Sequence, residues 1–350
     1  MMALISRHLL ESTLFCLLLC VLASCFRQAA AARYAIRLIG ISKFAIPSVL
    51  LAPAGARIAV LWPATSWLAS VVHAVSATLA ALVGMLPSAI EIGHTAIDRV
   101  ILFIWFLGAA AMFAAWIARF QKSSYRLTLP FEREQQIMNR ALDSLGIHAV
   151  IPLRVSHALD GPALRGVWRP AVIVPAGLSE KLNHGEFHAV LLHEITHALR
   201  SDNLAAMFVH SLVCVFWFHP LLWIVERRLN LEREHACDEV VLACGIPSQT
   251  YAASILKVCK IHLFDAVSGV SAATGSCIKL RLDYILKDRH STRLSYAPKL
   301  LIAGLAILMT TVPIAGGYCQ QCVSSGRALT AGRHTCFGAR DPALRRLCSK

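Results

Sequence analysis

The sequence predicts a mostly α-helical membrane protein with four transmembrane helices and an inserted α+β domain. Hydrophobic residues make up 57% of the chain and charged residues only 15%, whereas soluble domains carry about 25% charge. Four apolar runs, at 8–26, 34–53, 100–118 and 298–317, each approach the roughly 20 residues needed to cross a bilayer. Between the third and fourth runs, residues 119–297 have ordinary charge density and suffice for one domain.

The N-terminal membrane region, residues 1–118, contains two ambiguous segments. The first run partly resembles a cleaved signal sequence, but Glu11 and the closely following second run favour a retained helix. Residues 58–90 contain no Asp, Glu, Lys or Arg. A fifth span there would reverse the orientation of Arg27 and Arg33, against the positive-inside rule. We therefore expect 58–90 to be exported or interfacial.

The distribution of Lys and Arg predicts the orientation. Basic residues cluster at 27–43 and at the start of 119–297, which places both segments in the cytoplasm of a multi-pass bacterial inner-membrane protein. The tail, 318–350, is then exported. Its four cysteines are expected to form disulfides, with a zinc knuckle as the alternative reading: Cys319, Cys322, Cys336 and Cys348.

The net charge of +14 fits attraction to anionic lipid head groups, because the basic residues are spread beside the predicted spans. No Gly-rich phosphate loop and no interleaving of aromatic and basic residues occurs in the sequence. We therefore expect the lipid bilayer as a partner and no direct binding of nucleic acid.

The strongest motif is H-E-I-T-H, residues 193–197, within an apolar run that predicts a helix. Positions i and i+4 share a helix face, so His193 and His197 can bind one zinc ion. Glu194 is then placed to take a proton from the attacking water. His184 and His188 have the same spacing, but no carboxylate accompanies the first of them, so a second metal is not expected there.

The order of elements around the motif supports an α+β domain. A helix is expected within 130–147 and short strands at 150–155 and 166–175, where Pro170 and Pro175 indicate an edge strand. An edge beside the site could pair with an extended peptide, although a plain structural hairpin fits the pattern equally well. Ser179 is a plausible N-cap of the motif helix.

Residues 204–224 are almost wholly apolar and could be mistaken for another span. A span there would split the metal site across the bilayer. We therefore predict a buried or membrane-dipping helical hairpin broken near His219-Pro220.

The third zinc ligand is not decided by chemistry alone. Several side chains with suitable donor atoms crowd one predicted helix over Arg227 to Leu242: Glu232, Glu234, His235, Asp238 and Glu239. Glu234 and Asp238 share a face, so one of them could bind metal while the other orients a ligand or a helix.

The chain here resembles the M56 family of integral-membrane zinc peptidases, which includes transducers of the BlaR/MecR type. Three motifs carry the resemblance over roughly residues 1–315: H-E-I-T-H-A-L-R-S-D, F-H-P-L-L-W and E-R-E-H-A-C-D-E-V-V-L. The resemblance implies a gluzincin-like fold and one Zn²⁺ per chain. It further implies His193, His197 and Glu234 as ligands and Glu194 as the catalytic residue. Asp238 and Asp202 are expected to support them.

These features lead to the expectation of a zinc endopeptidase that cleaves a cytoplasmic protein in signal transduction. The substrate would be a transcriptional repressor or the chain itself. The sequence ends soon after the fourth run, with no S-x-x-K motif in the tail, so antibiotic sensing by acylation is not expected. The alternatives are a non-proteolytic signalling or scaffold protein with structural zinc, and a membrane module that binds a partner without metal.

Overall fold

The computed structural model describes most of the chain. The described residues are 2–26, 29–47, 95–121, 127–148, 150–159, 161–265, 272–287 and 299–307, with single positions 51, 53, 57 and 311. The predicted interfacial segment 58–90 and the tail 318–350 with its cysteines lie outside them. Residues Cys16–Ile41 and Ala96–Ile302 belong to one compact unit, and the remaining residues to a second.

Two described helices are long and apolar enough to cross a membrane. Helix α1 (Met2–Ser24) contains the candidate span Leu4–Ser24, and α5 (Thr95–Gln121) contains Ala96–Arg119. They coincide with the first and third predicted spans, and no other helix within the described ranges meets the same criteria.

The second predicted span, 34–53, is not one continuous helix. Helix α2 (Ala30–Ser42) ends in the 3₁₀ turn η1 (Lys43–Ala45), before Pro47. A residue that precedes proline is biased against helical conformation, which contributes to this ending. Within the fourth predicted span, residues 299–307 are helical. The total of four spans therefore stays a prediction.

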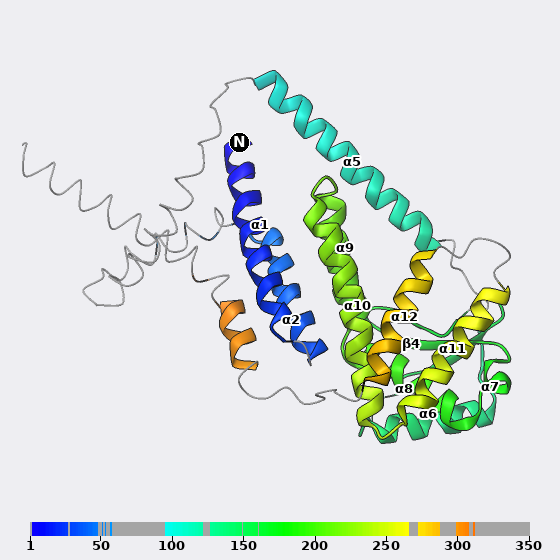
Figure 1. Cartoon of the computed structure of the whole chain (residues 1–350). Coiled ribbons are helices and arrows are strands. Elements are labelled where there is room, and N and C mark those ends of the chain that lie inside the picture. The colour runs from blue at the N-terminus through cyan, green and yellow to red at the C-terminus, as the bar shows by residue number, and fades with distance from the viewer. Residues whose placement is uncertain are drawn as a thin grey trace, which may run out of the picture. The chain divides into compact units, whose positions relative to one another are not determined.

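The part of the chain from Leu127 to Leu286 combines a small sheet with seven helices among its described residues, as drawn in Figure 1. Its strands are β1 (Leu127–Thr128), β2 (Leu153–Ser156), β3 (Ala163–Arg165) and β4 (Ala171–Pro175). Its helices are α6 (Glu132–Ser144), α7 (Leu178–Lys181), α8 (His184–Leu199), α9 (Asp202–Val215), α10 (Pro220–Ala243), α11 (Ser248–Asp265) and α12 (Ala272–Leu286).

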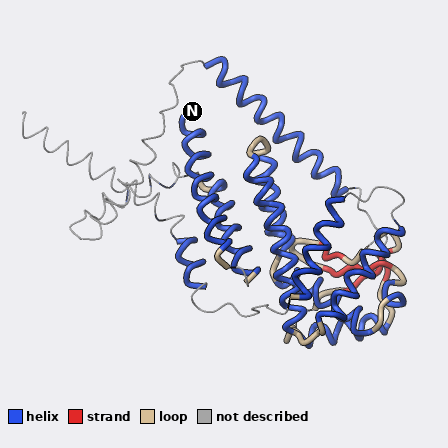
Figure 2. Tube along the Cα trace, in the orientation of Figure 1, coloured by secondary structure: helices blue, strands red, loops and turns tan. Residues whose placement is uncertain are grey.

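The four strands form one sheet in the order β1-β2-β4-β3, and strands are red in Figure 2. Strand β4 pairs in parallel with β2 and antiparallel with β3, so the prediction that 166–175 forms an edge strand was wrong. Pro170 precedes β4 and Pro175 is its last residue, so neither proline interrupts the ladder inside the strand. The edge strands are instead β1 and β3, which the sequence pattern did not reveal.

Helix α8 begins later than Ser179, so that predicted N-cap was also wrong. Asn183 is the N-cap, because its side chain accepts a hydrogen bond from Glu186 N at 2.8 Å while the Glu186 carboxylate accepts one from Asn183 N at 2.9 Å. This reciprocal pair is a capping box. Ser179 lies in the preceding helix, α7, and its hydroxyl donates to Glu134 at 2.7 Å.

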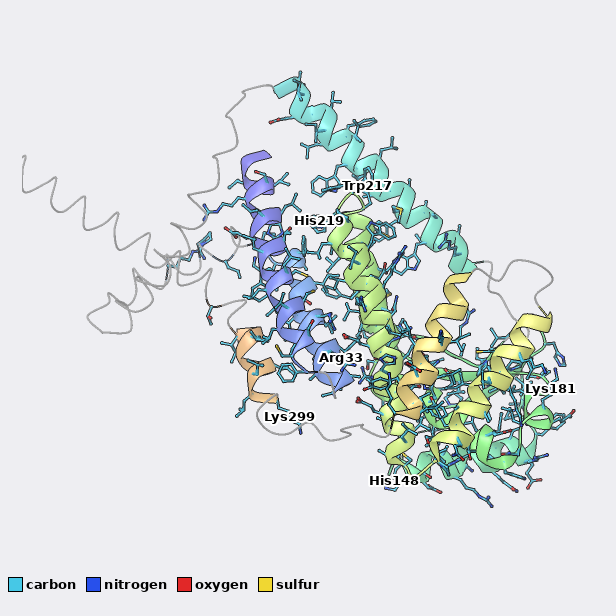
Figure 3. All side chains as sticks on the ribbon, viewed as in Figure 1. Arg33, His148, Lys181, Trp217, His219 and Lys299 are labelled. Atoms are coloured by element: carbon cyan, nitrogen blue, oxygen red, sulfur yellow. The ribbon has the colours of Figure 1, made fainter. Side chains whose placement is uncertain are left out.

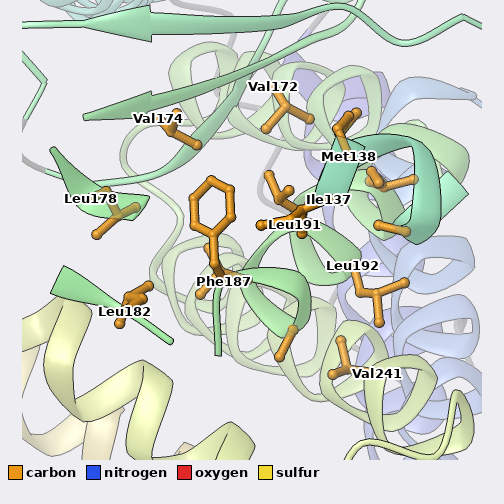
Figure 4. Packing of buried hydrophobic residues seen from close by; sticks show 14 of the residues in the cluster. Ile137, Met138, Val172, Val174, Leu178, Leu182, Phe187, Leu191, Leu192 and Val241 are labelled. Atoms are coloured by element: carbon orange, nitrogen blue, oxygen red, sulfur yellow. The ribbon is translucent and has the colours of Figure 1, made fainter. Parts of the chain in front are cut away.

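The hydrophobic core fixes α8 between the sheet and its neighbouring helices. Phe187 is fully buried on α8, and Figure 4 shows its ring directed toward Val174 of β4. Leu191 and Leu192, one turn further along α8, are also fully buried. Burying side chains of this size contributes about 1.5–3 kcal/mol each. The motif that follows is therefore held on a rigid helix.

Helices α9 and α10 form the predicted hairpin, with the break at His219-Pro220 confirmed. Proline at the first helical position of α10 suits a helix start, because its missing N–H would have no partner within the helix. The hairpin places the start of α9 and the middle of α10 beside α8.

Helix α2 is joined to α10 by buried polar contacts. Glu232 accepts hydrogen bonds from Arg33 Nε, at 3.1 Å, and from Arg37 Nη1. Glu239 accepts from the backbone N–H of Ala30 at 3.0 Å and from the Tyr284 hydroxyl at 2.5 Å. Two arginines that the positive-inside rule placed in a loop thus also bind the helix that carries Glu234.

Candidate metal centre

His193 and His197 point toward one another from successive turns of α8. Their Nε2 atoms are 3.1 Å apart, and their ring planes are nearly perpendicular at 89°. Both side chains are buried. Their i and i+4 spacing on a helix fixed by the core produces this arrangement.

Glu234 reaches the same point from α10. Its Oε2 lies 3.3 Å from His193 Nε2, and its Oε1 lies 3.7 Å from His197 Nε2. Ligand atoms of the three residues all lie within 4.8 Å of one another. The structure therefore brings together the three predicted ligands, although 41 residues separate His193 from Glu234.

Two aspartates lie behind the histidines, on the side of their Nδ1 atoms. Asp202, at the start of α9, lies 2.7 Å from His197 Nδ1. The Tyr251 hydroxyl lies 2.8 Å from His193 Nδ1 and donates to Asp238 at 2.6 Å, so it accepts from the histidine. Both rings can therefore keep a proton on Nδ1 and offer the Nε2 lone pair to an ion in the site. Such outer partners are typical of histidines that bind metal.

The donor set fits a zinc ion. Two Nε2 lone pairs that face each other at 3.1 Å repel unless a cation or a proton lies between them. With Zn–N bonds of about 2.0–2.1 Å and tetrahedral angles, two ligand atoms lie roughly 3.3 Å apart. The observed separations of 3.1 and 3.3 Å match that value. Three protein ligands also leave a fourth position open, as in catalytic zinc sites.

The electrostatics of these side chains show the same preference for positive charge. Burial lowers the pKa of His197, but hydrogen bonds with Asp202, Cys237 and Glu234 outweigh it and raise this pKa to about 12. Burial raises the pKa of Glu234, yet hydrogen bonds to both histidines hold it well below its usual range. The carboxylate is therefore ionised and the centre stabilises a cation.

A cavity of about 350 Å³ opens onto the centre. Glu194 lines it beside the histidines and is 8% exposed, and its carboxylate makes no hydrogen bond or ion pair with any described residue. Edge strand β3 contributes Ala163 and Leu164 to the wall, and the Asn203 side chain holds the carbonyls of Leu164 and Gly166. The cavity thus brings together three candidate ligands, the Glu194 carboxylate and a strand edge.

Two arginines that the sequence analysis did not predict as site residues also line this cavity. Arg281, on α12, donates to both Asp238 oxygens, at 2.6 and 3.1 Å, and its Nη1 lies 3.3 Å from Glu234. Arg233 Nη2 lies 3.3 Å from the other Glu234 oxygen. Arg281 lies among apolar residues of α12, a separate helix. The only signal in the sequence that could have indicated its role is a positive charge within that apolar segment.

The remaining side chains considered for the third ligand lie elsewhere. Glu232 and Glu239 bind α2, and the His235 ring stacks on Tyr284 with centroids 4.0 Å apart. A second group with metal-binding donors, His197, Asp202 and Cys237, shares His197 and faces its Nδ1 side. His184 and His188 line a different cavity and belong to neither group within the described residues.

A family model described as BlaR1 peptidase M56 matches residues 3–285. This chain belongs to the M56 peptidase family. The regulatory protein BlaR1 of Bacillus licheniformis is similar to it, with 31% identity over 150 residues, which make up 42% of this chain and 25% of BlaR1. The methicillin resistance mecR1 protein of Staphylococcus aureus is 26% identical over 200 residues, or 54% of this chain and 34% of that protein. The M56 chain therefore aligns with about a third or less of these relatives' length.

Proposed function

We propose that this M56 protein is an integral-membrane zinc endopeptidase that cleaves a cytoplasmic protein in signal transduction. The observation that carries the proposal is the convergence of His193, His197 and Glu234 on one point, with Glu194 beside them in an accessible cavity. A purely structural zinc site has four protein ligands and needs neither an open position nor a base.

The roles of the residues follow from the geometry. A zinc ion on the three ligands would polarise the scissile carbonyl and acidify water. Glu194 accepts the proton of the attacking water and delivers it to the leaving amine as the C–N bond breaks. Arg233 and Arg281 supply positive charge to the cavity, where negative charge develops on the carbonyl oxygen. The Tyr251 hydroxyl is already engaged by His193 and Asp238, so we assign it to positioning.

The substrate and topology are part of the same proposal. The printed names of the relatives describe a regulatory protein and a resistance protein, which supports a role in signalling. A transcriptional repressor or the chain itself is the substrate that we infer, with the peptidase domain in the cytoplasm of a bacterial inner-membrane protein. Edge strand β3 can hold an extended segment of that substrate at the cavity.

Glu194→Gln tests the function. The variant should retain one zinc per chain, because Glu194 is not a ligand, and should lose about 10²–10⁴-fold in cleavage rate. Zinc is measured by elemental analysis, and cleavage by comparative proteomics of membranes that contain the wild type or the variant. Glu180→Gln, an exposed change on α7, is the matched control and should cleave normally.

The outcomes separate the alternatives. Retained zinc with undiminished cleavage by Glu194→Gln would contradict the assignment of the base. Zinc without cleavage by the wild type would favour the signalling or scaffold protein with structural zinc. A purified wild type without stoichiometric zinc would favour a module that binds its partner without metal.

A further inference from the structure

The α9–α10 hairpin is unusually apolar for a part of a peptidase domain. Between Asp202 and Glu226 the sequence contains no Asp, Glu, Lys or Arg. Several of its large apolar side chains are more than a third exposed: Leu204, Met207, Phe208, Phe218 and Ile224. Contiguous exposed apolar surface marks a contact with another apolar phase or partner.

The tip of the hairpin is bound to α5, the more apolar of the two candidate spans. Trp105 Nε1 donates to the Val215 carbonyl at 2.5 Å, and Trp217 Nε1 donates to the Trp105 carbonyl at 3.2 Å. The Trp105 ring also stacks on Phe216 with centroids 6.2 Å apart. Figure 3 shows Trp217 at the turn of the hairpin.

The contact lies near the middle of α5. Trp105 and Gly108 both fall well inside the candidate span Ala96–Arg119. A Cβ at Gly108 would lie only 2.3 Å from the Trp217 ring, so the absence of a side chain at this position allows the close approach. The hairpin tip therefore meets α5 at the depth where a crossing helix is surrounded by acyl chains.

The first polar pair of the hairpin meets α5 near the end of its span. The His210 ring lies 5.0 Å from that of Trp116, and His210 Nδ1 lies 2.7 Å from Glu226. Trp116 precedes Arg119, and tryptophan and arginine are typical of a membrane–water interface. Glu226, the first charged residue of α10, thus lies near the end of the α5 span that Trp116 marks.

The turn at the tip also meets the requirement that backbone groups at membrane depth be satisfied by protein. The Val215 carbonyl accepts from Trp105, and the Trp217 carbonyl accepts from Trp223 Nε1 at 2.9 Å. The N–H of His219 donates to the Phe216 carbonyl at 2.8 Å. Several groups of the irregular backbone between the two helices therefore have protein partners.

We propose that the α9–α10 hairpin is a re-entrant membrane element whose tip inserts to the middle of the bilayer along α5, with its exposed apolar side chains against acyl chains. The proposal rests on the part of the proposed function in which α5 crosses the membrane. It is independent of catalysis.

The hairpin would also set the position of the active site. Along α10 the rise from Pro220 to Glu234 is about 21 Å, whereas half of the hydrocarbon core is about 15 Å. With the tip at the middle of the bilayer, Glu234 lies at the membrane surface. A segment of substrate adjacent to the bilayer is then within reach of the metal centre.

Photo-crosslinking tests the proposal on the full chain in vesicles of phosphatidylethanolamine and phosphatidylglycerol. A benzophenone amino acid replaces Phe218 or Ile224 in the hairpin, which are 44% and 58% exposed. Phe106 of α5 (74% exposed) is the control for a crossing helix, and Trp168 of the domain (83% exposed) is the control for a water-exposed site. Lipid adducts identified by mass spectrometry are expected at 106, 218 and 224, and not at 168.

Each other outcome overturns the proposal in a distinguishable way. Lipid adducts at 106 without adducts at 218 and 224 would place the hairpin outside the bilayer. Crosslinks from 218 and 224 to a second copy of the chain would identify a protein interface instead. Absence of lipid adducts at 106 would contradict both the membrane crossing by α5 and the insertion of the hairpin. It would not bear on the zinc chemistry, which Glu194→Gln tests separately.

Discussion

Asp202 contacts a candidate ligand of the metal centre directly. Its carboxylate accepts the Nδ1 proton of His197 at 2.7 Å and also binds Arg200 at 3.3 Å. The first contact fixes the tautomer and orientation of a ligand, and such outer contacts typically contribute 10–100-fold to metal affinity. Arg200 in turn lies over the Tyr34 ring, with 5.1 Å from the guanidinium to the ring centroid, so Asp202 also connects the centre with α2.

We predict that Asp202→Asn weakens zinc binding about 10–100-fold. The amide is a poorer acceptor for the His197 Nδ1 proton and can present a donor to it instead. Competition with a chromophoric zinc chelator measures the affinity of the purified protein. Asp283→Asn is the control, since among the described residues Asp283 forms an ion pair only with Lys287, at the exposed end of α12. Unchanged zinc affinity in Asp202→Asn would remove Asp202 from the support of the centre.

Sequence reasoning at this scale succeeded where the chemistry was local. His193, Glu194 and His197 could be predicted because helix periodicity alone places them together. Glu234 needed the family resemblance, because Glu232 and Asp238 on the same helix offer the same chemistry. The roles of Arg281 and Tyr251 could not be predicted, since both reach the centre through tertiary packing from α12 and α11.

At the scale of elements, the capping box at the start of α8 holds the motif helix in place. Glu186 accepts from Asn183 N and, through both oxygens, from Lys257 of α11 at 2.7 Å. Burial raises the pKa of Glu186, but Lys257 and the Asn183 N–H outweigh it and hold this pKa below its usual value. The ionised carboxylate is therefore favoured in the folded state.

We predict that Glu186→Gln lowers the stability of the domain by about 1 kcal/mol at neutral pH. Because the folded-state pKa is depressed, the contribution of the charge is present above the unfolded-state pKa of about 4.3 and is lost as the pH falls through the folded-state value. Thermal unfolding in detergent, at neutral and acidic pH, measures the difference between wild type and variant. That difference should shrink below about pH 4. Glu180→Gln should show none, and a pH-independent difference would contradict the role of the charge.

The elements themselves were predicted unevenly, for physical reasons. The break at His219-Pro220 was predicted correctly because proline acts locally on the backbone. The position of β4 inside the sheet was not predicted correctly. Pro170 lies just before the strand and Pro175 is its last residue, so neither proline prevents pairing on both sides. Ser179 has a side chain suited to an N-cap. Asn183 is the N-cap of α8 instead, because it forms a capping box with Glu186.

At the scale of the whole molecule, α10 connects the parts of the larger compact unit. Its N-terminal end binds α5 through the hairpin tip, and Glu232 and Glu239 bind α2. On the same helix Glu234 faces α8, and Asp238 binds Arg281 of α12. The contacts between α2 and α10 could not be predicted from the sequence, because they join residues about 200 positions apart. A shift of α10 relative to α8 would change the distances between Glu234 and the two histidines directly.

The same connectivity predicts a large effect of metal removal on stability. A zinc ion on His193, His197 and Glu234 would join α8 to α10, and a ligand at 1,000 times its dissociation constant stabilises the folded state by about 4 kcal/mol. For a domain of this size that corresponds to a fall in Tm of roughly 8–16 °C on chelation. Thermal unfolding in detergent, before and after dialysis against a chelator, measures the shift. Glu194→Gln should show the full shift and His193→Ala/His197→Ala little or none. An identical Tm with and without metal in the wild type would mean that the ion does not hold these two helices together.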